Sequence, residues 1–177
     1  FMAVPVTFPG ASTTISAMNN LTINNLYDVE LDKDITVTGT LSLAAGTFNL
    51  LSKTLTVSGN VTRSSGSIDA DQGNVVFSNA SDISLPTSLF SGTVVTLSKT
   101  SGAGTVTMND HLTVTGNMST TVSTGAWITA ASKQLTVNGT LTNNGTFTMK
   151  DGATFAEASK AASAAATGRR GGRRGRG

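Results

Sequence analysis

The residues best suited to bind a ligand are hydroxyl side chains at alternate positions of a repeated motif. They are Thr36, Thr38, Thr56, Ser58, Thr96, Ser98, Thr113, Thr115 and Thr136. Alternate side chains of a strand point to the same face, so stacked copies of the motif would form a flat ladder of hydroxyls. Such a ladder could order water and bind ice, or bind sugar hydroxyls. Thr is also a favoured residue of exposed strands, and Val76 and Asn138 interrupt the array.

The C-terminal segment Gly168–Gly177 is a second candidate for binding. It contains the arginines Arg169, Arg170, Arg173, Arg174 and Arg176. Their charge would attract polyanions such as acidic polysaccharide, lipopolysaccharide or nucleic acid. No aromatic residue accompanies them to stack on bases, so we predict no specific nucleic-acid binding. A linker or a processing remnant is the alternative interpretation.

Four carboxylates alternate along Asp28, Glu30, Asp32 and Asp34, and calcium prefers clusters of oxygen ligands. Carboxylates spaced along one strand are too far apart to converge without a bend, and the spacing matches no calcium-binding loop. We therefore predict a solvated face and no metal site.

The single His, His111, follows Asp110, and the single Trp is Trp127. A serine hydrolase site would need a nucleophile on a sharp strand-to-helix turn, and no such motif is present in the right context. We therefore predict no catalytic residue, no cofactor and no enzyme activity. Trp127 could stack on a sugar ring, but packing over the edge of a coil is the preferred interpretation.

Composition limits the class of protein. Hydrophobic residues make up 38% of the 177 residues, charged residues 12% and aromatic residues 5%, and the formal net charge is +2. The Thr and Val content favours strands over helices. There is no Cys, which excludes disulfides and thiolate metal sites, and no apolar run is long enough to span a membrane.

Hydrophobic periodicity predicts the fold. Strands beginning at Ile35, Leu55, Val75 and Val95 lie about 20 residues apart, and strands at Leu112 and Leu135 continue the series at looser spacing. We predict an all-β, right-handed parallel β-helix (β-solenoid) with coils of about 20 residues. An antiparallel β-sandwich or jelly roll is the alternative.

Alternation within these strands predicts the buried side chains, and the Gly that follows several strands is expected to allow a positive φ at the corner. The predicted inward positions are Ile35, Val37, Leu55, Val57, Val75, Phe77, Val95, Leu97, Leu112, Val114, Leu135 and Val137. The predicted domains are an irregular lead-in or cap over 1–20, the solenoid over 21–155, and a flexible tail over 156–177. The tail is Ala-rich at first and then Arg/Gly-rich.

The motifs Asn20–Asn25, Ile35–Leu43 and Ser52–Gly59 resemble the repetitive β-helical surface proteins of Bacteroidetes-type bacteria. Such proteins are secreted and often carry a type IX sorting domain, which this chain does not show after residue 155. The resemblance implies an extracellular or cell-surface structural or adhesive role, not an enzyme.

Two hypotheses for function follow. The first is a non-catalytic extracellular structural or adhesive module that associates with itself as the subunit of a filament or surface layer. The alternative is a glycan- or ice-binding solenoid that uses the ladder of Thr and Ser hydroxyls.

Overall fold

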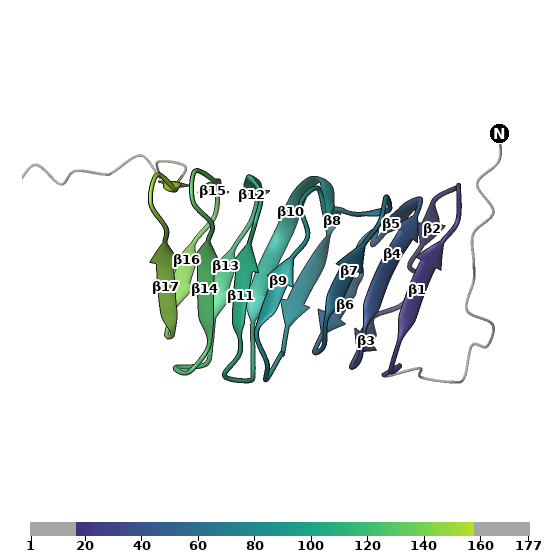
Figure 1. Ribbon diagram of the computed structural model, residues 1–177, viewed down its shortest axis with the longest axis horizontal. Helices are drawn as coiled ribbons and strands as arrows, with labels where there is room; N and C mark the ends of the chain where they lie inside the picture. The colour runs from purple at the N-terminus through teal and green to yellow at the C-terminus, as the bar shows by residue number, and fades with distance from the viewer. Residues whose placement is uncertain (1–16, 158–177) are drawn as a thin grey trace, which may run out of the picture.

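The computed structural model describes residues 17–157 and shows a β-solenoid of about seven turns (Figure 1). Every strand pair in it is parallel, which excludes the antiparallel sandwich. The described residues contain no helix. The turns contribute strands to three faces, and a strand inside a ladder pairs with the strand one turn before it and the strand one turn after it.

The strands are grouped by face. Face 1 contains β1 (Leu21–Asn24), β4 (Leu41–Ala45), β7 (Val61–Arg63), β9 (Ile83–Leu85), β11 (Thr105–Met108), β14 (Ala126–Thr129) and β17 (Thr146–Met149). Face 2 contains β2 (Val29–Glu30), β5 (Thr47–Asn49), the first parts of β8 (Ser67–Phe77) and β10 (Phe90–Lys99), β12 (Leu112–Val114), β15 (Gln134–Val137) and β18 (Thr154–Glu157). Face 3 contains β3 (Ile35–Val37), β6 (Thr54–Val57), the second parts of β8 and β10, β13 (Met118–Thr120) and β16 (Leu141–Asn143).

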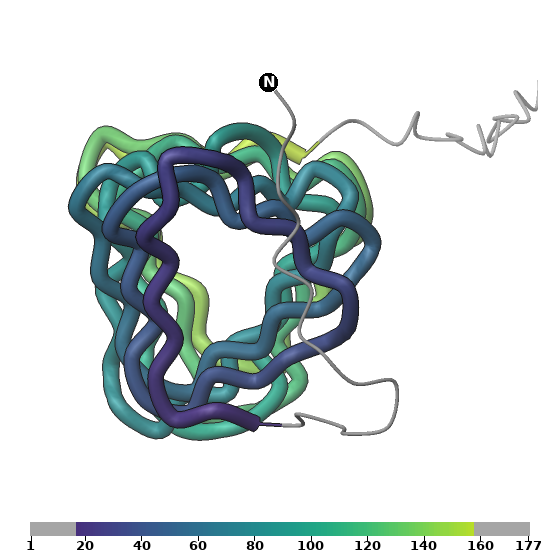
Figure 2. Tube along the Cα trace, turned by 90° about the vertical axis from the view of Figure 1, so that its right-hand side faces the viewer, coloured from purple at the N-terminus to yellow at the C-terminus, as the bar shows by residue number. Residues whose placement is uncertain are grey.

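The solenoid is right-handed, as predicted. In Figure 2 the chain starts nearest the viewer and runs clockwise as it recedes. A clockwise path that moves away from the viewer is a right-handed coil. This is the hand that connections between parallel strands of one sheet almost always take.

The core runs along the axis of the stack and consists of inward apolar side chains from all three faces. Eleven of the twelve predicted inward residues are buried, and the exception is Val95. Val95 is half-buried because β10 bends between its two faces: Val94 points inward on face 2 and Leu97 on face 3. Full burial of such a side chain stabilises the fold by roughly 1.5–3 kcal/mol, and it requires a neighbouring coil on each side.

The repeated motif does not form a single column. Ile35, Leu55 and Val75 are cross-strand neighbours on face 3, and Leu97 continues that column. Leu112 and Leu135 pair with each other on face 2 instead. The expected single series is therefore wrong in its second half, because an alternating strand followed by a bend suits any face of the coil.

The glycines after these strands serve a different purpose from the predicted one. Positive φ values occur at Gly46, Gly102 and Gly152, not at Gly39 or Gly59. At Gly59 a Cβ atom would clash with the backbone oxygen of Gly39 in the preceding coil. The corner glycines are therefore needed for close approach of successive coils.

Face 1 is interrupted in the middle of the stack. β1, β4 and β7 form a three-stranded sheet, while β9, β11, β14 and β17 form a separate four-stranded sheet. Consecutive coils remain joined there through faces 2 and 3, where β8 pairs with β10. The stack therefore has one place, between β7 and β9, where two coils lack a strand ladder on one face (Figure 1).

The predicted boundaries differ slightly from the observed ones. Met18, assigned to the lead-in, forms a bridge with Val37. Ala156 and Glu157, assigned to the tail, end β18. The remaining lead-in (1–16) and tail (158–177), including the Ala-rich stretch, lie outside the described residues.

Candidate functional site

The predicted hydroxyl ladder is divided between two faces. Thr36 and Thr56 are neighbours on face 3, where Val76 is next in the column and Ser98 follows it. Thr113 and Thr136 are neighbours on face 2. The structure therefore brings together two short rows of hydroxyls rather than one flat array.

Hydrogen bonds within the protein already use several of these hydroxyls. Thr38 Oγ1 donates to the Met18 carbonyl oxygen at 3.1 Å, and Thr115 Oγ1 donates to the Val94 carbonyl oxygen at 3.4 Å. Ser58 Oγ lies 2.6 Å from Ser78 Oγ, one coil further on. Thr96 Oγ1 bonds to the amide oxygen of Asn74. These bonds connect successive coils, which gives the ladder a structural role beside any binding role.

A polar cleft of about 310 Å³ lies at the corner between faces 3 and 1, beside the interruption of face 1. Its lining residues are Thr38, Gly39, Thr40, Ser58, Gly59, Asn60, Ala80, Ser81 and Ile83. Two predicted ladder residues, Thr38 and Ser58, belong to it. Sequence reasoning missed Thr40, Asn60 and Ser81; the signal available was their position directly after the corner residues Gly39, Gly59 and Ala80.

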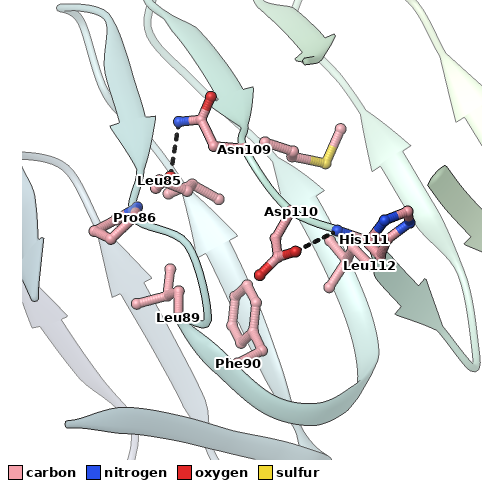
Figure 3. A pocket seen from close by; sticks show the side chains of 9 residues that line it. Leu85, Pro86, Leu89, Phe90, Asn109, Asp110, His111 and Leu112 are labelled. Carbon is pink, nitrogen blue, oxygen red and sulfur yellow. Dashed lines mark hydrogen bonds between the residues drawn. The ribbon is translucent and has the colours of Figure 1, made fainter. Parts of the chain in front are cut away.

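Asp110 and His111 line a second, much smaller cavity of about 30 Å³, which is room for about one water molecule. Apolar side chains including Leu85, Leu89 and Phe90 form most of its wall (Figure 3). The Asp110 carboxylate accepts from the backbone N–H of Ser88 at 2.8 Å and from that of His111 at 2.9 Å.

Hydrogen bonding gives Asp110 and His111 a role in joining coils. The Ser88 N–H holds the pKa of Asp110 below its usual value, against the opposing effect of burial. His111 Nδ1 accepts from the backbone N–H of Gln134 at 3.2 Å, one coil further on.

The carboxylates of the acidic run Asp28–Asp34 lie outside regular strand structure for the most part. Only Val29 and Glu30 of this stretch are in a strand, and Asp34 Oδ1 accepts from the backbone N–H of Thr54 at 2.8 Å. Within residues 17–157, no three His, Cys, Asp or Glu side chains gather closely enough to hold a metal ion.

Trp127 is fully buried, which rules out stacking on a sugar at the surface. Its ring meets Phe77 edge-on with centroids 5.8 Å apart, and its Nε1 donates to Thr120 Oγ1 at 2.8 Å. Packing is therefore the correct interpretation. Phe48, another large buried aromatic residue, lies in β5 on face 2.

Lys99 is the residue that sequence reasoning missed most clearly. Its side chain is fully buried, although the sequence presents it as an ordinary Ser-Lys step like those at Lys53 and Lys133. The available signal was alternation: Lys99 lies two residues after the inward Leu97, so its side chain points to the same side of the strand. The Nζ of Lys99 donates to the backbone oxygen of Asn79 at 3.2 Å, to its side-chain Oδ1 at 3.0 Å and to the Ser101 carbonyl oxygen at 3.1 Å.

The last coil of the described residues is partly exposed. Phe147 and Met149 are half-buried and Phe155 is 39% exposed, whereas their neighbours one coil earlier, Trp127 and Leu135, are fully buried. Phe147 and Phe155 pack on each other with ring centroids 6.1 Å apart. The predicted polyanion-binding arginines of the tail lie outside the described residues.

The chain matches no family model, no curated protein and no solved structure. Among residues 17–157 there is also no helix of the length and apolarity that a membrane crossing needs.

Proposed function

We propose that this chain is a non-catalytic structural or adhesive module of the cell surface or extracellular space that associates with itself end to end. The observation that carries the proposal is the open C-terminal coil. Its inward side chains Phe147, Met149 and Phe155 occupy positions that are buried in every internal coil of their columns. An edge strand with unpaired backbone groups is a template for pairing with another chain.

A second copy is the proposed occupant of this end. β17, β18 and β16 continue the same three faces on which β1, β2 and β3 begin the stack. The N-terminal coil of one copy can therefore extend the ladders of another. A head-to-tail contact of this kind does not close on itself and produces a filament.

Sedimentation velocity over a concentration series, followed by electron microscopy, tests the proposal. Wild-type protein should form larger species as concentration rises, and Phe155→Asp should shift this onset to higher concentration. Thr56→Asp, which adds the same charge to an outer position of the second coil, should assemble like wild type. Monomers at every concentration, or equal effects of both substitutions, would contradict end-to-end assembly.

The polar cleft favours a second candidate function, binding of a glycan or another hydroxyl-rich surface such as ice. Thr38, Thr40, Ser58, Asn60 and Ser81 supply hydroxyl and amide groups around a volume of about 310 Å³. Ligand sites fix their ligands with a small number of such polar groups. Ser58→Trp should fill the cleft and abolish retention on a glycan array, while Thr136→Trp on face 2 should not. Equal retention of the two variants on the glycan array would contradict binding in this cleft.

A further inference from the structure

Lys99 and Asn79 form a pair of fully buried polar side chains that neither proposed function uses. Asn79 follows β8, at the corner that leads to β9, and Lys99 is the last residue of β10, one coil later. Lys99 Nζ lies 3.0 Å from Oδ1 of Asn79, the oxygen bonded to the amide carbon Cγ. The lysine nitrogen is thus held in contact with the side-chain amide of Asn79, away from water.

The amide of Asn79 is held in place by its other atoms. Its Nδ2 donates to the Ser81 carbonyl oxygen at 2.7 Å and to the Thr105 carbonyl oxygen at 3.4 Å. Lys99 Nζ is likewise restrained by the backbone oxygens of Asn79 and Ser101. Fixed reacting groups lower the entropic part of a barrier, which is how oriented intramolecular reactions become fast.

The buried charge supplies a driving force. Within residues 17–157 the single ion pair joins Lys133 and Asp110, so Lys99 has no carboxylate in contact to offset the cost of burial. Burial lowers the pKa of Lys99, opposed by the more distant charge of Asp82, and so favours the neutral amine that can attack a carbonyl.

We propose that Lys99 and Asn79 form an intramolecular isopeptide bond. The Nζ lone pair forms a bond to Cγ of Asn79, the Cγ–Nδ2 bond breaks, and Nδ2 leaves as ammonia. Starting from the lysine ammonium, the products are one neutral secondary amide and one ammonium ion, so the reaction removes the buried charge. The proton that Nζ gives up passes to the leaving nitrogen.

The position of the bond fits its use as a clamp. Asn79 lies between β8 and β9, beside the place where β7 and β9 lack a strand ladder. The bond would join the third coil to the fourth where one face of the stack is interrupted. It therefore reinforces the solenoid independently of whether the chain assembles into filaments.

Mass spectrometry of the full chain tests the proposal. The intact protein should weigh less than its sequence by the mass of one ammonia molecule. Trypsin does not cut after an acylated lysine, so digestion should yield one peptide over 64–133 with no fragment ions between residues 79 and 99. This second readout separates the bond from succinimide formation at an asparagine, which also releases ammonia but leaves cleavage at Lys99 intact.

Two variants complete the test. Lys99→Arg keeps the charge but not the nucleophile and should yield separate peptides over 64–99 and 100–133 at full mass. Lys133→Arg, at a half-buried lysine on the surface of a later coil, should retain the bond. Wild-type protein of full mass, cleaved at Lys99 after prolonged incubation across a pH series, would overturn the proposal.

Discussion

Polar side chains at the corners hold neighbouring coils together. Asn20, Asp34, Asp82 and Asn117 each accept the backbone N–H of a residue 20 or 23 positions further on, at 2.7–2.9 Å. Their partners are Thr40, Thr54, Thr105 and Thr140. A side chain before a strand thereby satisfies the first donor of the strand in the next coil, which would otherwise lack a partner.

The Asp110 carboxylate accepts the backbone N–H of Ser88 in the preceding coil, and this bond predicts a pH dependence of stability. Its folded-state pKa is below the usual value because the Ser88 N–H bonds to the carboxylate. Its stabilisation is therefore complete above the ordinary aspartate pKa and is lost as pH falls through the lower folded value.

Asp110→Asn should lower the urea midpoint at neutral pH and leave it unchanged once the pH lies below the folded-state pKa. Urea denaturation followed by circular dichroism along a pH series measures this convergence. A gap between the two proteins that stays constant down to low pH would assign the effect to packing rather than to charge.

At the scale of the coil, the corner glycines set how closely successive turns approach. Gly59 stacks on Gly39, and Gly139 stacks on Gly116. In both pairs a Cβ atom on the later glycine would clash with the backbone oxygen of the earlier one. A side chain here must displace backbone, and backbone in a stacked coil moves only with its neighbours.

Gly59→Ala should therefore lower the free energy of unfolding by about 1–3 kcal/mol, the usual cost of overpacking. Gly92→Ala is the matched control, because a Cβ there has nothing within 4 Å. It should leave stability unchanged or slightly raised, since Ala restricts the unfolded chain. Thermal unfolding of both variants measures the difference, and a Gly59 variant as stable as wild type would remove the close-approach argument.

The sequence predicts the coil but not which face each strand occupies. Alternation identified Ile35, Leu55 and Leu135 as inward, and all three are buried. Nothing in the motif distinguishes face 3, where Leu55 lies, from face 2, where Leu135 lies, because both need the same alternating strand. Face membership depends on corner lengths, and these vary: Val75 pairs with Leu97, a step of 22 residues, while Ile35 and Leu55 are 20 apart.

The same limit applies to the candidate sites. The prediction of one hydroxyl ladder requires all copies of the motif to lie on the same face. The copies lie on two faces, so Thr56 and Thr113 are in separate rows. The cleft depends on the interruption between β7 and β9, which arises from pairing and not from any one residue. The inward direction of Lys99 follows from the alternation of side chains along its strand. Its partner Asn79 lies one coil away, and only the three-dimensional register brings the two together.

For the whole molecule, stability is expected to fall toward the open C-terminal end. In a solenoid each coil is stabilised by its neighbours, and the last coil has a described neighbour on one side only. β17 and β14 share one ladder on face 1, yet the inward residues of β14 are fully buried and those of β17 are half-buried.

Amide hydrogen exchange should reflect this gradient. At low protein concentration the amides of β17 and β18 should exchange faster than those of β14 and β15, because the end coil opens without unfolding the rest. At high concentration, end-to-end association would cover that coil and slow exchange in β17 and β18 while leaving β14 unchanged. Exchange measured by mass spectrometry at the two concentrations separates the cases: uniform protection along the stack would contradict the gradient, and a concentration-independent gradient would confirm a frayed end without assembly.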